Sequence, residues 1–154
     1  MCSSDLKMRM KPVRRIVCVD GRDGKSKAIE DGPAPVRTDP ARPGFSSTFV
    51  WATDSTPASI DTASEPAHVL TPPPGGSLCR VLTFPPERAH RGMRKTRTLD
   101  FCLILEGEIT LVLDTEEVHL KAGDTVVQRG TPHAWSNRSD APCVLAISSH
   151  DATY

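Results

Sequence analysis

Short runs of β-branched, aromatic and other apolar residues recur along the chain, separated by turn-forming residues. Runs of this length that end in glycine, proline, asparagine or aspartate are typical of β-strands. By contrast, no stretch longer than two helical turns keeps apolar residues at helical spacing without a breaker, so we expect few helices. The pattern predicts strands at residues 14–19, 26–30, 45–53, 77–84, 100–114, 117–123, 124–130, 133–137 and 143–149.

Turn signals such as "DGRDGK" and "LEGE" interrupt these runs, and short strands with a turn about every eight to twelve residues are typical of an antiparallel sandwich or barrel. The 14 prolines cluster before residue 90 and predict ordered loops there. The length of 154 residues suits one domain. We expect a flexible N-terminus at residues 1–12, N-terminal strands and proline-rich loops at residues 13–67 that pack on the barrel, and the barrel itself at residues 68–150.

Charge and cysteine content narrow the classes of partner and compartment. The 19 basic residues balance the 19 acidic ones, and no basic tract stands out. We therefore expect neither a nucleic acid nor a membrane surface as a partner. The five cysteines are odd in number and show no CxxC spacing, which argues against a disulfide framework and against a cysteine-rich zinc site. With no apolar run of signal-peptide or membrane-spanning length, a cytoplasmic protein with reduced thiols is expected.

Two stretches in the second half carry a recognisable spacing. The stretch "MRKTRTLDFCLILEGEI" (93–109) places Arg94, Thr96 and Asp100 ahead of a glycine turn, and "AGDTVVQRGTPHAWSN" (122–137) places His133 after two glycine turns. These stretches resemble the two motifs of small single-domain cupins. The resemblance implies an all-β fold, a double-stranded β-helix (cupin) barrel of the jelly-roll type, with extra N-terminal strands.

The first motif departs from the cupin pattern at its metal ligands. The family pattern is His-x-His followed by Glu, whereas Arg94, Thr96 and Asp100 occupy these positions here. A guanidinium is always protonated and offers only donors, and a threonine hydroxyl is a poor ligand for a transition metal. Only Asp100 and His133 remain, and a catalytic zinc site ordinarily has three protein ligands. We therefore expect no metal cofactor, and leave open Mn, Fe, Zn or Ni held by His133, Asp100 and His90.

Arg94 suggests a replacement for the metal. A metal ion stabilises negative charge on oxygen, and the planar guanidinium of Arg94 can do so by binding a carboxylate or enolate. His133 would then be the general acid or base, with Thr96 and Asp100 as orienting partners. Alternatively, Arg94 and Asp100 pair with each other at the barrel mouth, and the two interpretations can coexist.

Other side chains are candidate parts of a ligand pocket. Trp135 lies two residues after His133 and should share its face of the strand. Trp51 is expected to cover one end of the pocket, with aromatic packing as its alternative role. Arg80 could be a second anion anchor, depending on which way its strand faces. We interpret Cys102 as a buried, inert thiol, because no activating histidine is tied to it by spacing.

These residues favour a metal-independent lyase or isomerase that acts on a small anionic organic molecule, by decarboxylation, dehydration or enolisation of a small carboxylate or polyketide-like compound. The resemblance to cupins implies a secondary-metabolite or catabolic pathway. A non-catalytic barrel that binds a small ligand stays open, as does a metal-dependent enzyme with an irregular ligand set. We also expect a homodimer, because the β-rich segment 14–19 could pair with an edge of a second copy.

Overall fold

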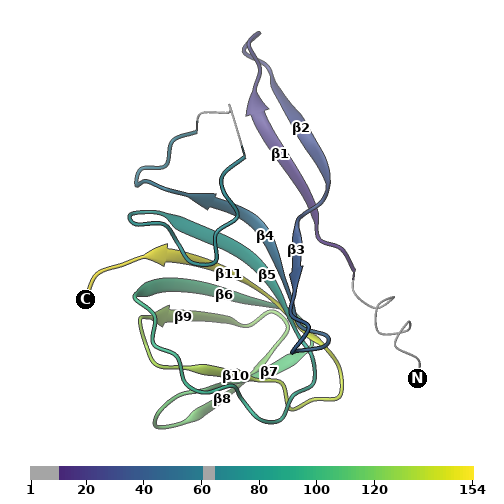
Figure 1. Cartoon of the computed structure of the whole chain (residues 1–154), viewed down its shortest axis with the longest axis vertical. Helices are drawn as coiled ribbons and strands as arrows, with labels where there is room; N and C mark the ends of the chain where they lie inside the picture. The colour runs from purple at the N-terminus through teal and green to yellow at the C-terminus, as the bar shows by residue number, and fades with distance from the viewer. Residues whose placement is uncertain (1–10, 61–64) are drawn as a thin grey trace.

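The structure, a computed structural model, describes residues 11–60 and 65–154 (Figure 1). Those residues form strands and loops and contain no helix, in agreement with the sequence pattern. The strands are β1 (Arg14–Asp20), β2 (Ser26–Pro33), β3 (Val36–Thr38), β4 (Ser46–Thr53), β5 (Ser77–Phe84), β6 (Thr98–Glu106), β7 (Glu108–Val112), β8 (Glu117–Lys121), β9 (Thr125–Arg129), β10 (Ala134–Ser136) and β11 (Cys143–Asp151).

Two sheets form the barrel. The larger sheet has the strand order β3-β4-β5-β11-β6-β9, the smaller one has the order β10-β7-β8, and every pairing is antiparallel. Figure 1 shows the smaller sheet facing the lower part of the larger one. Strand neighbours that are distant in sequence, such as β5 beside β11, are the crossovers expected of a jelly roll. The predicted all-β antiparallel fold is confirmed.

The hydrophobic core lies between these two sheets. Ile104 and Leu145 come from the larger sheet, Ile109 and Leu120 from the smaller one, and all four are buried in one cluster. Burying a side chain of this size stabilises the fold by about 1.5–3 kcal/mol. The core therefore holds the two sheets together and fixes which face of each strand points inward.

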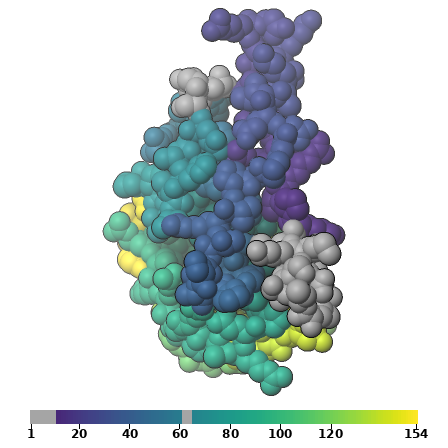
Figure 2. Space-filling model, turned by 45° about the vertical axis from the view of Figure 1, so that its right-hand side comes forward, coloured from purple at the N-terminus to yellow at the C-terminus, as the bar shows by residue number. Residues whose placement is uncertain are grey.

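The N-terminal strands contribute to the barrel. Of the segment 13–67, which was expected to pack on the barrel, β3 and β4 belong to the larger sheet, so this sheet begins before residue 68. The strands β1 and β2 form a hairpin with a sheet of their own, as the turn signal predicts. Figure 2 shows this hairpin projecting from the body of the molecule. Most of the N-terminus expected to be flexible, residues 1–12, falls outside the described residues.

One buried arginine connects the hairpin to the larger sheet. Arg15 of β1 donates a hydrogen bond to the Val50 carbonyl at 3.2 Å and makes ion pairs of 2.7 Å with Glu30 and with Glu65. Its guanidinium carbon lies 5.8 Å from the centre of the Trp51 ring. Burial alone would lower the pKa of Arg15, but the hydrogen bonds to Glu30 and Glu65 outweigh this effect and leave the pKa raised. Two carboxylates thus balance the charge of Arg15, while its Nε is buried without a hydrogen-bond partner among the described residues.

Hydropathy gives no sign of a membrane-spanning helix: within residues 11–60 and 65–154, no helix is long and apolar enough to cross a bilayer.

Candidate functional site

Arg94 and His133 lie opposite each other at one end of the barrel. Their backbones form an isolated antiparallel bridge, in which the Arg94 N–H donates to the His133 carbonyl at 2.8 Å and the His133 N–H donates to the Arg94 carbonyl at 2.9 Å. Directly opposed residues of an antiparallel pair project their side chains to the same side. The two residues that the sequence predicts as anion anchor and acid or base are therefore neighbours.

The orientation of the His133 ring is fixed by one hydrogen bond. Its Nδ1 lies 2.8 Å from the Thr131 carbonyl. A carbonyl oxygen only accepts, so we assign the proton to Nδ1, which leaves Nε2 with a lone pair. The Trp135 ring packs edge-on to it, with 6.1 Å between ring centres. In this tautomer Nε2 of His133 can accept a proton.

Three polar side chains project into the barrel beneath this pair. Asp100 lies two residues before Cys102 on β6, and Cys102 belongs to the core, so both share the inward face. Gln128 of β9 pairs directly with Asp100. Arg80 of β5 pairs with Ile147, another core residue. Arg80, whose facing the sequence leaves open, therefore points into the barrel.

Each of these three side chains has one buried hydrogen-bonding atom without a partner among the described residues. The Nε of Arg80, the Oδ1 of Asp100 and the Nε2 of Gln128 are buried, and each has no hydrogen-bond partner among the described residues. The other amide atom of Gln128, Oε1, accepts a short hydrogen bond from the Thr131 hydroxyl. A buried polar group without a partner costs about 1–3 kcal/mol. Such a cluster inside a barrel is typical of a binding site rather than of a structural core.

The charge of Arg80 is not neutralised by an ion pair within the described residues. Burial lowers the pKa of its guanidinium, and the positive charge of Arg94 acts in the same direction, whereas Asp100 acts against both. The influence of Arg94 places the two guanidinium groups in one electrostatic environment. Nor does Arg94 make an ion pair with Asp100 in the described part of the chain. The alternative in which Arg94 and Asp100 simply pair is therefore not what the structure shows.

The side chains around the cupin metal position do not fit a divalent metal. The described residues contain no group of three or more His, Cys, Asp or Glu side chains that could hold one. Thr96 is exposed, and its hydroxyl lies 2.9 Å from that of Thr98. His90, the expected third ligand, is exposed on its loop and its Nδ1 accepts from the Gly92 N–H at 3.2 Å. The donor set near the site is therefore Asp100 and His133.

One predicted ligand-binding residue lies elsewhere. Trp51 pairs with Cys79, which precedes Arg80 and so faces the other side of the sheet. There its ring contacts Arg15, outside the barrel. A β-bulge between Phe49 and Trp51 changes the alternation of this strand, which is why the sequence pattern did not give its facing. Trp51 therefore does not line the interior.

Gln128 was missed in the sequence. It lies in the predicted strand 124–130, two residues after Val126, at a position where alternation places a core residue. A polar residue at such a position was the available signal. The cupin motif does not include this position, so the resemblance gave no reason to examine it.

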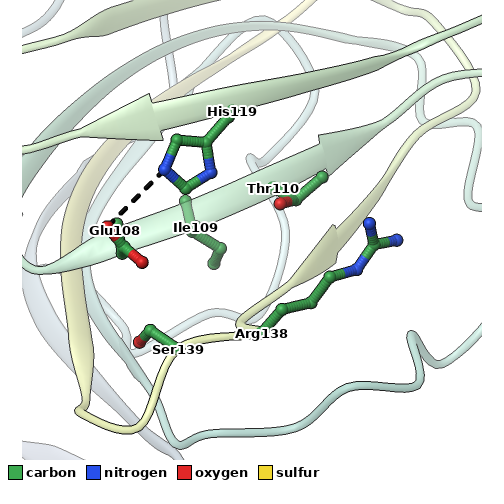
Figure 3. Close-up of a pocket in the computed structure, with 6 residues that line it drawn as sticks. All are labelled: Glu108, Ile109, Thr110, His119, Arg138 and Ser139. Carbon is green, nitrogen blue, oxygen red and sulfur yellow. Dashed lines mark ion pairs between the residues drawn. The ribbon is translucent and has the colours of Figure 1, made fainter.

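A separate shallow hollow lies at the smaller sheet, bordered by Glu108, Ile109, Thr110, His119, Arg138 and Ser139 (Figure 3). Its charged groups already have partners. Nε2 of His119 lies 3.6 Å from Glu108, and the guanidinium of Arg138 binds both carboxylate oxygens of Glu117 at 2.6 and 2.8 Å. Among the described residues, three of the four buried side-chain atoms without a hydrogen-bond partner belong to Arg80, Asp100 and Gln128 in the barrel interior, the fourth is the Nε of Arg15, and none borders this hollow.

Comparison with known proteins agrees with the fold. The Cupin_2 family, described as a cupin domain, matches residues 80–149. Phomopsin biosynthesis cluster protein C' of Diaporthe leptostromiformis is 40% identical over 100 residues, which cover 59% of this chain and 52% of that protein. Oryzines biosynthesis cluster protein J of Aspergillus oryzae is 29% identical over 144 residues, 88% of this chain and 80% of that protein. Cupin-domain-containing oxidoreductase virC of Hypocrea virens is 33% identical over 95 residues, which cover 58% of this chain and 48% of that protein.

The chain spans about half the length of the phomopsin and virC relatives. Among solved structures, a Cupin 2 conserved barrel domain protein from Salinispora arenicola has a TM-score of 0.54 at 18% identity, covering 82% of this chain and 92% of the other. The Cnp3 cupin domain of Schizosaccharomyces pombe has a TM-score of 0.55 at 10% identity and covers 92% of this chain and 89% of its own. These likenesses, together with the domain match, give one conclusion: the chain is a small cupin-fold protein.

Proposed function

We propose that this protein is a metal-independent lyase or isomerase of a cytoplasmic biosynthetic pathway, acting on a small carboxylate or polyketide-like compound. The observation that carries the proposal is the pairing of Arg94 with His133 at the end of the barrel, above the unneutralised Arg80. A proton acceptor beside two positive charges is the arrangement needed to form and stabilise an enolate or a related anion.

The chemistry follows from these positions. Nε2 of His133 removes a proton from the carbon next to a carbonyl, and the electron pair of the broken C–H bond becomes the enolate. The guanidinium groups of Arg94 and Arg80 stabilise the oxygen that gains the charge. The imidazolium of His133 then returns the proton to another carbon, which completes an isomerisation, or to a departing hydroxide, which leaves as water in a dehydration. Asp100 compensates part of the positive charge inside the barrel.

The names of the relatives support the pathway context. Two of them are called biosynthesis cluster proteins, for phomopsin and for oryzines. The four described cysteines are free thiols, which is compatible with a reducing compartment.

A second candidate is an oxidoreductase, because three relatives carry that word in their names. It requires a metal held by Asp100 and His133 with a third ligand such as His90. Incubation of the purified protein with Mn, Fe, Zn and Ni, desalting, and metal counting by mass spectrometry separates the two candidates. One retained equivalent that disappears in His133→Ala favours the oxidoreductase, and near-zero retention of all four favours the metal-independent enzyme.

Arg94→Ala tests the anion anchor. It is expected to weaken the binding of small carboxylates by about tenfold or more, because a hydrogen bond to a charged group contributes about 1.5–3 kcal/mol, and to affect the matched amides much less. Calorimetry on both ligand sets measures the difference. Arg97→Ala removes another exposed arginine three residues away and serves as the control. Equal losses for carboxylates and amides would reduce Arg94 to a structural residue.

A further inference from the structure

The barrel interior presents two hydrogen-bond donors and one acceptor that have no partner within residues 11–60 and 65–154. The donors are the Nε–H of Arg80 and the Nε2–H of Gln128, and the acceptor is Oδ1 of Asp100. Asp100 and Gln128 are directly opposed on β6 and β9, and Asp100 is almost fully buried, with a relative exposure of 7%. Arg80 as a whole is half-buried. All three groups therefore lie on the inward face of the larger sheet, and Asp100 is close enough to Arg80 to raise its pKa against the effect of burial.

The Nε of Arg15 is also buried without a hydrogen-bond partner among the described residues, so it is the pairing of its charge that distinguishes Arg80 from Arg15. Both arginines are removed from solvent to a large degree, yet Arg15 makes ion pairs with Glu30 and Glu65 at 2.7 Å. Arg80 makes no ion pair with any described residue, and the net effect of its surroundings lowers its pKa, the opposite of the effect on Arg15. A buried charge that Asp100 compensates only in part costs stability, and such a cost is typical of a residue that binds a ligand.

The two donors and one acceptor of these side chains require a ligand that carries a hydrogen-bond donor as well as an anionic or carbonyl oxygen. Acceptor oxygens are needed for Arg80 and Gln128, so a carboxylate or enolate fits there. The same carboxylate would be repelled by Asp100, whose oxygens accept hydrogen bonds and donate none. A hydroxyl close to the acid or carbonyl group removes this conflict, because it donates to Asp100. A simple alkyl carboxylate satisfies the donors only.

We infer that the substrate is a hydroxylated carboxylate or carbonyl compound, bound through its acid or carbonyl oxygens to Arg80 and Gln128 and through its hydroxyl to Asp100. This inference rests on the proposed function for the reaction, but the recognition of the ligand is independent of turnover. In this role Asp100 and Gln128 determine specificity, while Arg80 acts with His133 and Arg94 on the reacting carbonyl group. The inward position of the three polar residues places the hydroxylated end of the substrate deepest in the barrel.

The stability of the free protein gives the first test. Replacing an uncompensated buried charge by an apolar side chain of similar length stabilises a fold, and residues kept for binding often reduce stability. Arg80→Met is therefore expected to raise the Tm by about 2–4 °C. Arg15→Met, the matched control, is expected to lower it, because Glu30 and Glu65 lose their partner. A lower Tm for Arg80→Met would make Arg80 structural and overturn the inference.

Ligand pairs that differ by one hydroxyl give the second test. The probes are 3-hydroxybenzoate with benzoate and 3-hydroxybutanoate with butanoate, measured by calorimetry on the full chain. The wild-type protein is expected to bind one hydroxylated member roughly tenfold more tightly than its partner, and Asp100→Leu is expected to lose this preference while still binding the simple acid. Equal binding within both pairs, or no binding of any probe, would overturn the substrate class.

The two proposals fail in different ways. A hydroxyl preference that depends on Asp100, found without conversion of any hydroxylated acid or ketone, would leave the recognition intact and overturn the proposed enzyme. Conversion that depends on His133, found with equal activity on hydroxylated and non-hydroxylated substrates, would support the enzyme and overturn the inferred substrate class.

Discussion

Cys102 and Cys143 face the barrel core and differ in chemistry from the exposed Cys18. Burial, with a contribution from Asp100, raises the pKa of Cys102 to about 12, and burial with a contribution from Glu108 raises the pKa of Cys143 to about 11. Only the thiolate is a nucleophile. At pH 8 these two thiols therefore stay protonated, and the fraction of thiolate rises only as the pH approaches these values.

We expect iodoacetamide at pH 8 to alkylate Cys18 in the native protein and to leave Cys102 and Cys143 unmodified until the chain is unfolded in urea. Peptide mass spectrometry of native and unfolded samples measures each site separately. Modification of Cys102 in the native protein as fast as that of Cys18 would contradict the expected burial, and would reopen a nucleophilic role for this thiol beside Asp100.

At the residue scale, the site was predictable where spacing determines position. Arg94 and His133 follow from the motif spacing, and the structure places them opposite each other; their catalytic roles stay predictions. Arg80 shares its face of β5 with Leu82 and Phe84, and the structure places both of these residues in the core. The bulge beside Trp51 has no local signature, so its placement outside the barrel could not be derived from alternation.

At the scale of the elements, a glycine in the turn between β6 and β7 ends one strand and begins the next. The predicted strand 100–114 divides at Gly107, where the φ angle is 77° and a Cβ would lie 2.5 Å from the Pro142 carbonyl oxygen. Gly123 also has a positive φ, of 95°, but a Cβ there would meet nothing within 4 Å. A left-handed conformation costs a residue with a side chain roughly 1–2 kcal/mol. Gly107 carries a steric cost in addition.

Gly107→Ala is therefore expected to reduce the free energy of unfolding by about 2–4 kcal/mol, and Gly123→Ala by only about 1–2 kcal/mol. Urea denaturation of both variants, followed by tryptophan fluorescence, measures the two losses under the same conditions. Since both variants share the backbone strain, their difference reports the contact with Pro142. Equal losses would mean that the Pro142 loop moves away at no cost.

Most strands were predictable from local pattern. The hairpin around "DGRDGK" and the strands of the second half agree with the sequence expectation, because alternation and turn residues are local properties. The short β3 was not predicted, since three residues carry too little pattern. Nor was the membership of β4 in the larger sheet, because its partners β3 and β5 are set by tertiary contacts.

At the scale of the whole molecule, apolar side chains on the outer face of the larger sheet are uncovered. Phe101, Leu103 and Val127 have relative exposures of 49%, 41% and 61%, and Phe101 pairs directly with Val127. The projecting hairpin adds Ile16 and Ile29, at 49% and 53%. An isolated two-stranded hairpin is marginally stable in water, and a contiguous exposed apolar patch is typical of an interaction surface. A second copy of the chain could cover both.

We therefore propose a homodimer formed through this sheet face and the hairpin. Size-exclusion chromatography with light scattering is expected to give a mass of twice 16.7 kDa, and Phe101→Asp is expected to shift the protein to the monomer, because a carboxylate would be buried without a partner. Thr115→Asp, on the exposed turn between β7 and β8, adds the same charge elsewhere and should stay dimeric. A monomeric wild-type protein would contradict the proposal. If Phe101→Asp stays dimeric, the interface lies at the hairpin and not at the sheet face. Ile16→Asp must then dissociate the dimer.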